Sequence, residues 1–135
     1  MIKSVKLAKE IVVTVVNKIG VLADISKFIA VYGINIDAVA GYSANNEAKI
    51  MLVTEDNIRA MDTLKKSGYN SVKENEVVMV DLENKAGALQ DITAKLANAG
   101  IDIKQIYGSA CTAGCPAKII IASEDIQKTL AALKK

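Results

Sequence analysis

Two stretches of the chain share one order of apolar and polar positions. Each opens with a run of apolar, mostly β-branched residues, at 10–16 and at 76–82, which is typical of a strand. Each run ends at an Asn-Lys-x-Gly turn, and apolar residues then recur at helical spacing. The residues that we expect these helices to bury are Leu22, Ile25, Ile29 and Tyr32 in the first stretch and Leu89, Ile92, Leu96 and Ala99 in the second.

The pattern after each predicted helix is also the same in both stretches. A glycine follows, Gly33 or Gly100, where a left-handed residue would end the helix. Two extended runs then predict a hairpin, and a second helix comes after it. We expect that helix to start at Thr54 or Ser123, because each side chain can cap the amides ahead; the two acids that follow each residue suit the positive helix end. Its predicted core face carries Ile58, Met61 and Leu64 in the first stretch and Ile126, Leu130 and Leu133 in the second.

A fixed offset of 67 residues superimposes the two stretches. Gly20 plus 67 is Gly87, and 15 of the 38 residues from 4 to 41 are identical to their partners in 71–108. After Gly108 the offset becomes 69, so the second copy carries a two-residue insertion. Such self-similarity indicates a duplicated structural unit.

The repeat predicts two domains with the element order βαββαβ. The first would span 10–75 and the second 76–135, but the second stops after its last helix and lacks a closing strand. Residues 1–9 contain the repeat partner of the segment 71–73, so we expect them to close the second unit. The alternative is that they only extend the first strand of the first unit.

The first strand of each unit does not alternate between apolar and polar residues, which indicates burial on both faces. In a βαββαβ unit the helices cover one face only, so the other face needs a cover. A second copy of the chain is the simplest cover, and we expect a homodimer; a central strand in a locally apolar monomer is the alternative.

Composition excludes several classes of function. The 135 residues are 51% hydrophobic and 24% charged, with 17 Lys and Arg against 15 Asp and Glu interleaved along the chain, which does not favour nucleic acid as a partner. There is no His, so catalytic and metal sites built on imidazole are excluded. No apolar run is long enough to span a membrane, so we expect a cytoplasmic protein. No acid/base or nucleophile constellation is present in the sequence, so we expect no enzymatic activity and no cofactor.

The segments 17–22 and 84–89, each with a Gly-Ile-(Asn/Asp)-Ile segment downstream, resemble those of tandem ACT domains, and the likeness covers nearly the whole chain. The resemblance implies an α+β fold of two ferredoxin-like βαββαβ units, with antiparallel sheets and helices on one face. It also implies the function of the free-standing amino-acid-binding ACT proteins, because no catalytic domain is attached.

In that family a small effector lies where the turn after the first strand of one unit faces the second strand of another. The implied ligand-binding residues are Asn17, Ile19, Gly20, Val21, Leu22 and Asn35, with Asn84, Ala86, Gly87, Ala88, Leu89 and Asp102 in the second copy. A glycine without Cβ and the free amides of a helix start suit a carboxylate. Alternatively, the glycines serve only the turn and the Asn residues cap the helix.

The resulting hypothesis is a regulatory protein that binds an amino acid between ACT units. The alternative is a regulatory subunit that docks on a biosynthetic enzyme, such as acetolactate synthase, without a ligand site. Cys111 and Cys115 lie beside the insertion, and we interpret them as turn residues; a redox pair and a metal site remain the alternatives.

Overall fold

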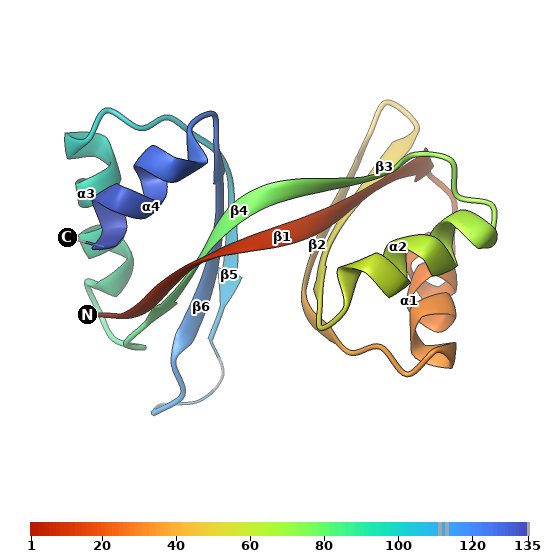
Figure 1. Ribbon diagram of the computed structural model, residues 1–135, viewed down its shortest axis with the longest axis horizontal. Coiled ribbons are helices and arrows are strands. Elements are labelled where there is room, and N and C mark those ends of the chain that lie inside the picture. Colours follow the sequence, from red (N-terminus) through yellow and green to blue (C-terminus); the bar gives the residue numbers. More distant parts are fainter. Residues whose placement is uncertain (111, 113, 135) are drawn as a thin grey trace. The chain divides into compact units, whose positions relative to one another are not determined.

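The computed structural model describes residues 1–110, 112 and 114–134. Its helices and strands follow one another as shown in Figure 1. The bounds are β1 Ile2–Val16, α1 Val21–Val31, β2 Ile36–Ala44, β3 Glu47–Thr54, α2 Asn57–Lys66, β4 Val72–Leu82, α3 Ala88–Asn98, β5 Ile103–Ser109, β6 Ala117–Ser123 and α4 Ile126–Lys134.

The chain forms two compact units. The first unit comprises residues 9–75, and the second unit comprises residues 1–8 together with 76–135. The strands β1 and β4 each contribute one part to either unit. The first unit therefore reads βαββαβ along the chain, and the second reads βαββα, with residues 2–8 as its further strand.

Repeat-related residues connect β1 with β4 in each unit. In the first unit the Thr14 backbone N–H donates to the carbonyl of Ser71 at 3.0 Å. In the second unit the hydroxyl of Ser4 donates to the carboxylate of Asp81 at 3.0 Å. Ser4 and Asp81 are the repeat partners of Ser71 and Thr14, so residues 2–8 stand in the second unit where the start of β4 stands in the first.

Each unit has the α+β ferredoxin-like arrangement that the sequence predicts, with both helices on one face of antiparallel strands (Figure 1). The strand order is β2-β3-β1-β4 in the first unit and β1-β4-β6-β5 in the second. The registers repeat as well, since Ile11 opposes Leu52 and its repeat partner Val78 opposes Ile121.

The helices bury only part of the face that the sequence predicts: Ile25, Ile29, Ile92 and Leu96 are buried as expected, and the residues at the ends of the predicted faces are not. Val21, Ile25 and Ile29 of α1 are buried, whereas Leu22 is 45% exposed and Tyr32 55% exposed. The cause is the helix start: Gly20 in the left-handed region makes Val21 the first helical residue, and the buried positions follow from it every four residues. Likewise α3 buries Ala88, Ile92 and Leu96 and leaves Leu89 exposed, and α2 leaves Ile58 exposed.

The caps of the second helices also differ from the expectation. Asp56, not Thr54, is the N-cap of α2, and its carboxylate accepts from the Arg59 N–H at 3.1 Å. The Thr54 hydroxyl accepts from the Asp56 N–H and donates to the Asn57 side chain, so it supports the turn before the helix. In α4, Asp125 takes the role expected of Ser123 by accepting from the Lys128 N–H at 3.0 Å. The carboxylate offers a charged acceptor to the positive helix end, which a hydroxyl does not.

Candidate functional site

The turn between β1 and α1 is open at Gly20. Gly20 has φ of 93°, in the left-handed region that favours glycine, and no described atom lies within 4 Å of the position that a Cβ would occupy. The Ile19 side chain before it is fully exposed. A small molecule can therefore approach the main chain at this turn directly.

The start of α1 offers backbone donors at the same place. The Asp24 N–H reaches the Gly20 carbonyl at 2.9 Å, which is the first full helical hydrogen bond. Within the described residues the N–H groups of Leu22 and Ala23 have no hydrogen-bond acceptor, as expected in a first helical turn that no side chain caps. With the positive end of the helix dipole behind them, these amides suit a carboxylate.

Asn17 stands at the entrance of this turn and does not cap the helix. Its backbone N–H donates to the Asn46 carbonyl at 2.7 Å in the hairpin between β2 and β3. Its side chain is exposed and makes no hydrogen bond with any described residue. The alternative in which Asn17 caps α1 therefore does not hold in this structure. Val21, the residue after Gly20, buries its side chain under α1 and presents only its backbone to the turn.

The second turn, before α3, repeats the backbone but is more crowded. Gly87 has φ of 89°, yet the methyl carbon of Met1 lies 3.6 Å from where its Cβ would stand. The Met1 carbonyl accepts from the Glu83 N–H at 2.8 Å, which holds the start of the chain beside the turn. The Asn84 side chain donates to the Thr112 carbonyl at 3.4 Å. The remaining predicted residues here are Ala86 and Leu89, which are exposed, and Ala88, which is buried.

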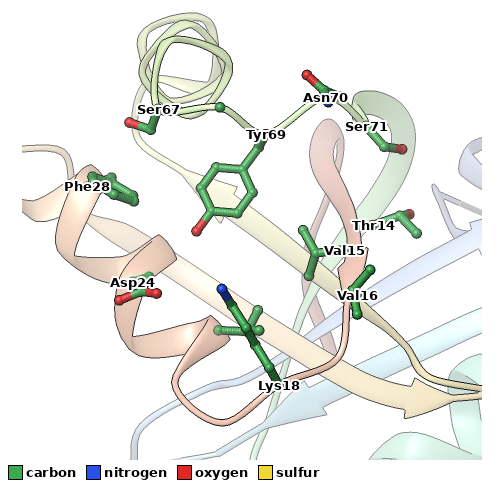
Figure 2. Close-up of a pocket in the computed structure, with 12 residues that line it drawn as sticks. Thr14, Val15, Val16, Lys18, Asp24, Phe28, Ser67, Tyr69, Asn70 and Ser71 are labelled. Carbon is green, nitrogen blue, oxygen red and sulfur yellow. The ribbon is translucent and has the colours of Figure 1, made fainter.

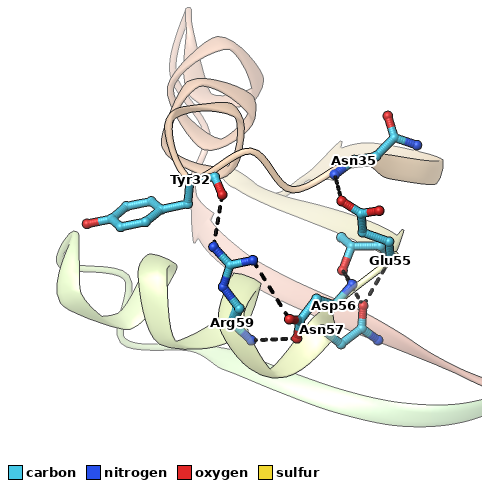
Figure 3. A network of polar contacts seen from close by, with 7 residues as sticks. Tyr32, Asn35, Glu55, Asp56, Asn57 and Arg59 are labelled. Atoms are coloured by element: carbon cyan, nitrogen blue, oxygen red, sulfur yellow. Dashed lines mark hydrogen bonds and ion pairs between the residues drawn. The ribbon is translucent and has the colours of Figure 1, made fainter.

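Asn35 lies far from Gly20 in its own unit. It precedes β2, whereas Asn17 contacts the hairpin that follows β2, and nine residues of strand separate these ends by about 30 Å. The Asn35 N–H donates to the Glu55 carboxylate at 3.0 Å and its carbonyl accepts from the Glu55 N–H at 3.1 Å (Figure 3). Asn35 can reach a ligand at such a turn only from another unit.

The network in Figure 3 fixes the end of the first unit that carries Asn35. The Arg59 guanidinium donates to the Tyr32 carbonyl at 2.9 Å, just after α1, and lies 3.9 Å from the carboxylate of Asp56. The Asn57 side chain donates to the Lys9 carbonyl at 2.9 Å in β1. These bonds connect the end of α1, the start of α2 and β1. They hold together the end of the first unit from which Asn35 projects.

Asp102, the repeat partner of Asn35, is an ion-paired residue. Its carboxylate lies 2.8 Å from the Lys104 ammonium, which is 3.3 Å from the carboxylate of Glu124. The hydrogen bonds to Asp102 and then Glu124 raise the pKa of Lys104, so the lysine keeps its charge. This pairing reduces the repulsion that Asp102 would exert on a ligand carboxylate.

Apolar side chains are exposed on the outer strands β2 and β5. Val39 of β2 is 50% exposed, and its repeat partner in β5, Ile106, is 40% exposed. Val39 opposes Leu52, which lies in the core under the helices, so Val39 projects on the helix side of the sheet. Because β2 and β5 are the outer strands, each presents an unpaired edge beside an apolar side chain.

A pocket of about 740 Å³ opens beside the Gly20 turn in the first unit, since Lys18 and Val21 are among the residues that line it. Its walls are the end of β1, the side of α1 that carries Asp24 and Phe28, and the loop 67–71 before β4 (Figure 2). In Figure 2 the side chains of Lys18 and Asp24 and the hydroxyl of Tyr69 point into the same space. The rings of Phe28 and Tyr69 meet edge-on, with centroids 6.1 Å apart.

Burial raises the pKa of the Tyr69 phenol, and the negative charge of Asp24 raises it further. The phenol is therefore neutral near pH 7 and can both donate and accept hydrogen bonds. The sequence reasoning missed this pocket, because Phe28 and Tyr69 have no aromatic partners in the second copy and lie on separate elements.

Three further features bear on function: metal sites, the cysteine pair and membrane spans. No group of three or more Asp, Glu or Cys among them is arranged to hold a metal ion. Cys111 lies outside the described residues, so the interpretation of the Cys111 and Cys115 pair stays a prediction. No helix within the described ranges combines the length and the apolar character needed to cross a membrane.

Neither a family model nor a curated protein matches the sequence. Solved structures match over almost the whole chain. The protein BT0572 from Bacteroides thetaiotaomicron superposes with a TM-score of 0.88 at 24% identity, covering 96% of this chain and 88% of that one. The ligand-free regulatory subunit of aspartate kinase from Thermus thermophilus has a TM-score of 0.68 at 16% identity, covering 98% and 96%. The corresponding subunit from Thermus flavus has a TM-score of 0.58 at 15% identity, again covering 98% and 96%. At these identities the likeness establishes the fold alone, and the chain shares the α+β fold of these structures.

Proposed function

We propose that this chain is a non-enzymatic regulatory protein that binds a small amino acid at the turn around Gly20. One observation carries the proposal: an unobstructed left-handed glycine leads directly into a helix start with free N–H groups. The ligand carboxylate would lie against the amides of Leu22 and Ala23, and the exposed Asn17 amide would hydrogen-bond its polar groups.

The site would be completed by another unit, whose segment before its second strand brings Asn35 or Asp102 to the ligand. Asn35 is too far from Gly20 to do this within one unit, and its connection to Glu55 pre-orders it for a partner. A site shared between units has a regulatory consequence, because a ligand that binds one arrangement of units better than another shifts the equilibrium between them. The similar regulatory subunits of aspartate kinase support a role of this kind.

The experiment that tests this function is a calorimetric titration of the full chain with each of the twenty amino acids. Binding of at least one, with loss on Gly20→Val, is the expected result. If no amino acid binds even at millimolar concentration, the proposal fails, and the chain is better explained as a docking subunit for a biosynthetic enzyme.

A further inference from the structure

We propose that the pocket formed by Lys18, Asp24, Phe28 and Tyr69 is a second small-molecule site, which takes a free α-amino acid with a large apolar or aromatic side chain. The ligand ammonium would pair with Asp24, its carboxylate with Lys18, and its side chain would pack on the two rings. This site lies within the first unit and does not depend on the function proposed for the turn at Gly20.

Two opposite charges in this pocket form no ion pair. Lys18 and Asp24 are exposed, neither side chain makes an ion pair or a hydrogen bond among the described residues, and the negative charge of Asp24 acts on the neutral Tyr69 phenol. The contrast with the second copy is direct: Lys85, the repeat partner of Lys18, lies 2.9 Å from the carboxylate of Glu83. Val16 stands at the repeat position of Glu83, so the first unit has lost the acid that would neutralise Lys18.

The apolar half of the pocket is built by residues from three elements. Phe28 belongs to α1, Tyr69 to the loop before β4 and Val15 to β1, and all three are half-buried. Their shared surface suits an apolar side chain, and an additional aromatic ring could pack edge-on or offset against the existing pair. The neutral Tyr69 hydroxyl lies toward the charged end, where it can hydrogen-bond the ligand backbone groups (Figure 2).

The repeat-related pocket in the second unit lacks most of the features that we assign to ligand binding. The corresponding pocket has about 340 Å³ and keeps the acid, Asp91. Lys95 replaces Phe28 and Ile2 replaces Tyr69, so both rings are missing. The first unit alone therefore combines two unpaired charges with an aromatic wall, which argues for a ligand rather than for a general demand of the fold.

Size and charge narrow the ligand class. The volume of about 740 Å³ falls within the usual range of small-molecule pockets, about 300–1,000 Å³. A ligand with one ammonium and one carboxylate near each other satisfies both Asp24 and Lys18, whereas a simple anion or cation leaves one of them unpaired. The carboxyl end of a peptide lacks an ammonium on the same carbon, so a free amino acid fits the pair of charges better.

The test uses L-phenylalanine with two analogues that each lack one charge, 3-phenylpropanoate and phenethylamine. Titration of the full chain should give binding of L-phenylalanine and about tenfold weaker binding of each analogue, as loss of one charge-assisted contact implies. Equal affinity for the three compounds, or no binding of L-phenylalanine at millimolar concentration, would overturn the proposal.

Variants that remove one charge at a time then test which residue binds the ligand ammonium and which binds its carboxylate. Asp24→Asn should abolish the preference for L-phenylalanine over 3-phenylpropanoate, and Lys18→Gln its preference over phenethylamine. Asp91→Asn, at the repeat position in the second unit, is the matched control and should leave both preferences unchanged. A loss with Asp91→Asn equal to that with Asp24→Asn would contradict the assignment.

Chemical-shift mapping separates this site from the turn. On addition of L-phenylalanine we expect perturbed side-chain signals of Phe28 and Tyr69. Perturbation confined to the amides of Leu22 and Ala23 would overturn the pocket and leave the turn site standing. Perturbation of the Phe28 and Tyr69 signals, with the amides of Leu22 and Ala23 unperturbed by every amino acid, would support the pocket and contradict the turn site.

Discussion

Gly20 and Gly87 have nearly the same backbone conformation, with φ of 93° and 89°, but Met1 lies beside Gly87 alone. The methyl carbon of Met1 is 3.6 Å from the Cβ position of Gly87, whereas no described atom comes within 4 Å at Gly20. The side chain of Asn84 is also hydrogen-bonded to Thr112, while that of Asn17 is not bonded to any described residue. The two turns therefore differ in access rather than in shape.

We predict that Gly20→Val abolishes amino acid binding at the first turn. A β-branched side chain fills the open space above the main chain and resists the left-handed conformation. The strain should lower the free energy of unfolding by about 1–2 kcal/mol. Calorimetry measures the affinity, and urea denaturation measures the stability.

Gly33→Val is the matched control for this variant. Gly33 also lies in the left-handed region, with φ of 70° and no described atom near its Cβ position, but it follows the other end of α1. We expect a similar loss of stability with unchanged affinity. Equal loss of binding in both variants would show that strain, and not obstruction of the turn, removes the ligand.

The different access of the two turns predicts unequal affinities. The first turn should bind its amino acid more tightly than the second, because a ligand at Gly87 must displace the Met1 side chain. Gly20→Val should therefore remove the tighter phase of a calorimetric titration and Gly87→Val only the weaker one. Two equal sites per chain in the unmodified protein would refute this ranking.

The repeat in the sequence was enough to predict the element order of both units, and the resemblance to tandem ACT domains implied the fold class. Apolar runs and paired turns survive duplication because each copy must bury its own core, so the comparison of 4–41 with 71–108 exposes them. The exact helix faces could not be predicted in the same way. Whether Val21 or Leu22 faces the core depends on the backbone of Gly20, which a spacing pattern does not contain.

The candidate site was predicted unevenly for a similar reason. The turn residues are adjacent in sequence and repeated, so a motif could reveal them. The pocket beside the turn is lined by Lys18, Phe28 and Tyr69 from separate parts of the chain, and of these three only Lys18 has an identical partner in the second copy. Capping at Asp56 instead of Thr54 was missed because both residue types are good caps, and the sequence pattern did not show which of the two stands at the helix start.

We predict that Asp56→Ala lowers the free energy of unfolding by about 1 kcal/mol, the usual effect of losing an N-cap. The Asp56 carboxylate accepts from the Arg59 N–H at 3.1 Å at the start of α2. Asp62→Ala, which removes a solvent-exposed ion pair with Lys66 in the same helix, should change the free energy of unfolding much less. Urea denaturation compares the two, and equal effects would contradict the capping role.

We predict that Tyr69 makes the protein less stable at alkaline pH. Burial and the Asp24 charge raise the pKa of the folded phenol above its ordinary value of 10.0, so folding favours the protonated form. This contribution is complete below the unfolded pKa and is lost as the pH rises through the folded pKa. Urea denaturation from about pH 9 upward should show a steeper loss of stability than in Tyr69→Phe.

Titration of the ring by NMR with labelled tyrosine checks the same prediction directly. Asp24→Asn should lower the pKa of Tyr69 toward its ordinary value, because one of the two causes is removed. Asp37→Asn, an exposed acid elsewhere in the first unit, should leave it unchanged. An unshifted Tyr69 in the unmodified protein would contradict both statements.

The sequence predicts a homodimer that covers the sheet face without helices, whereas the outer edge of β2 offers a different contact, beside Val39 on the helix side of the sheet. An unpaired strand edge beside the half-exposed Val39 favours pairing with a second chain, and a charge there opposes it. We predict a dimer at micromolar concentration by sedimentation analysis and a shift toward monomer in Val39→Glu. Ile58→Glu, at an 80% exposed position of α2 away from that edge, is the control and should leave the dimer intact. A monomeric unmodified protein would refute the dimer, and equal dissociation in both variants would place the contact elsewhere.

Because the proposed amino acid site needs a residue from another unit, Val39→Glu should also weaken ligand binding if that unit belongs to the second chain.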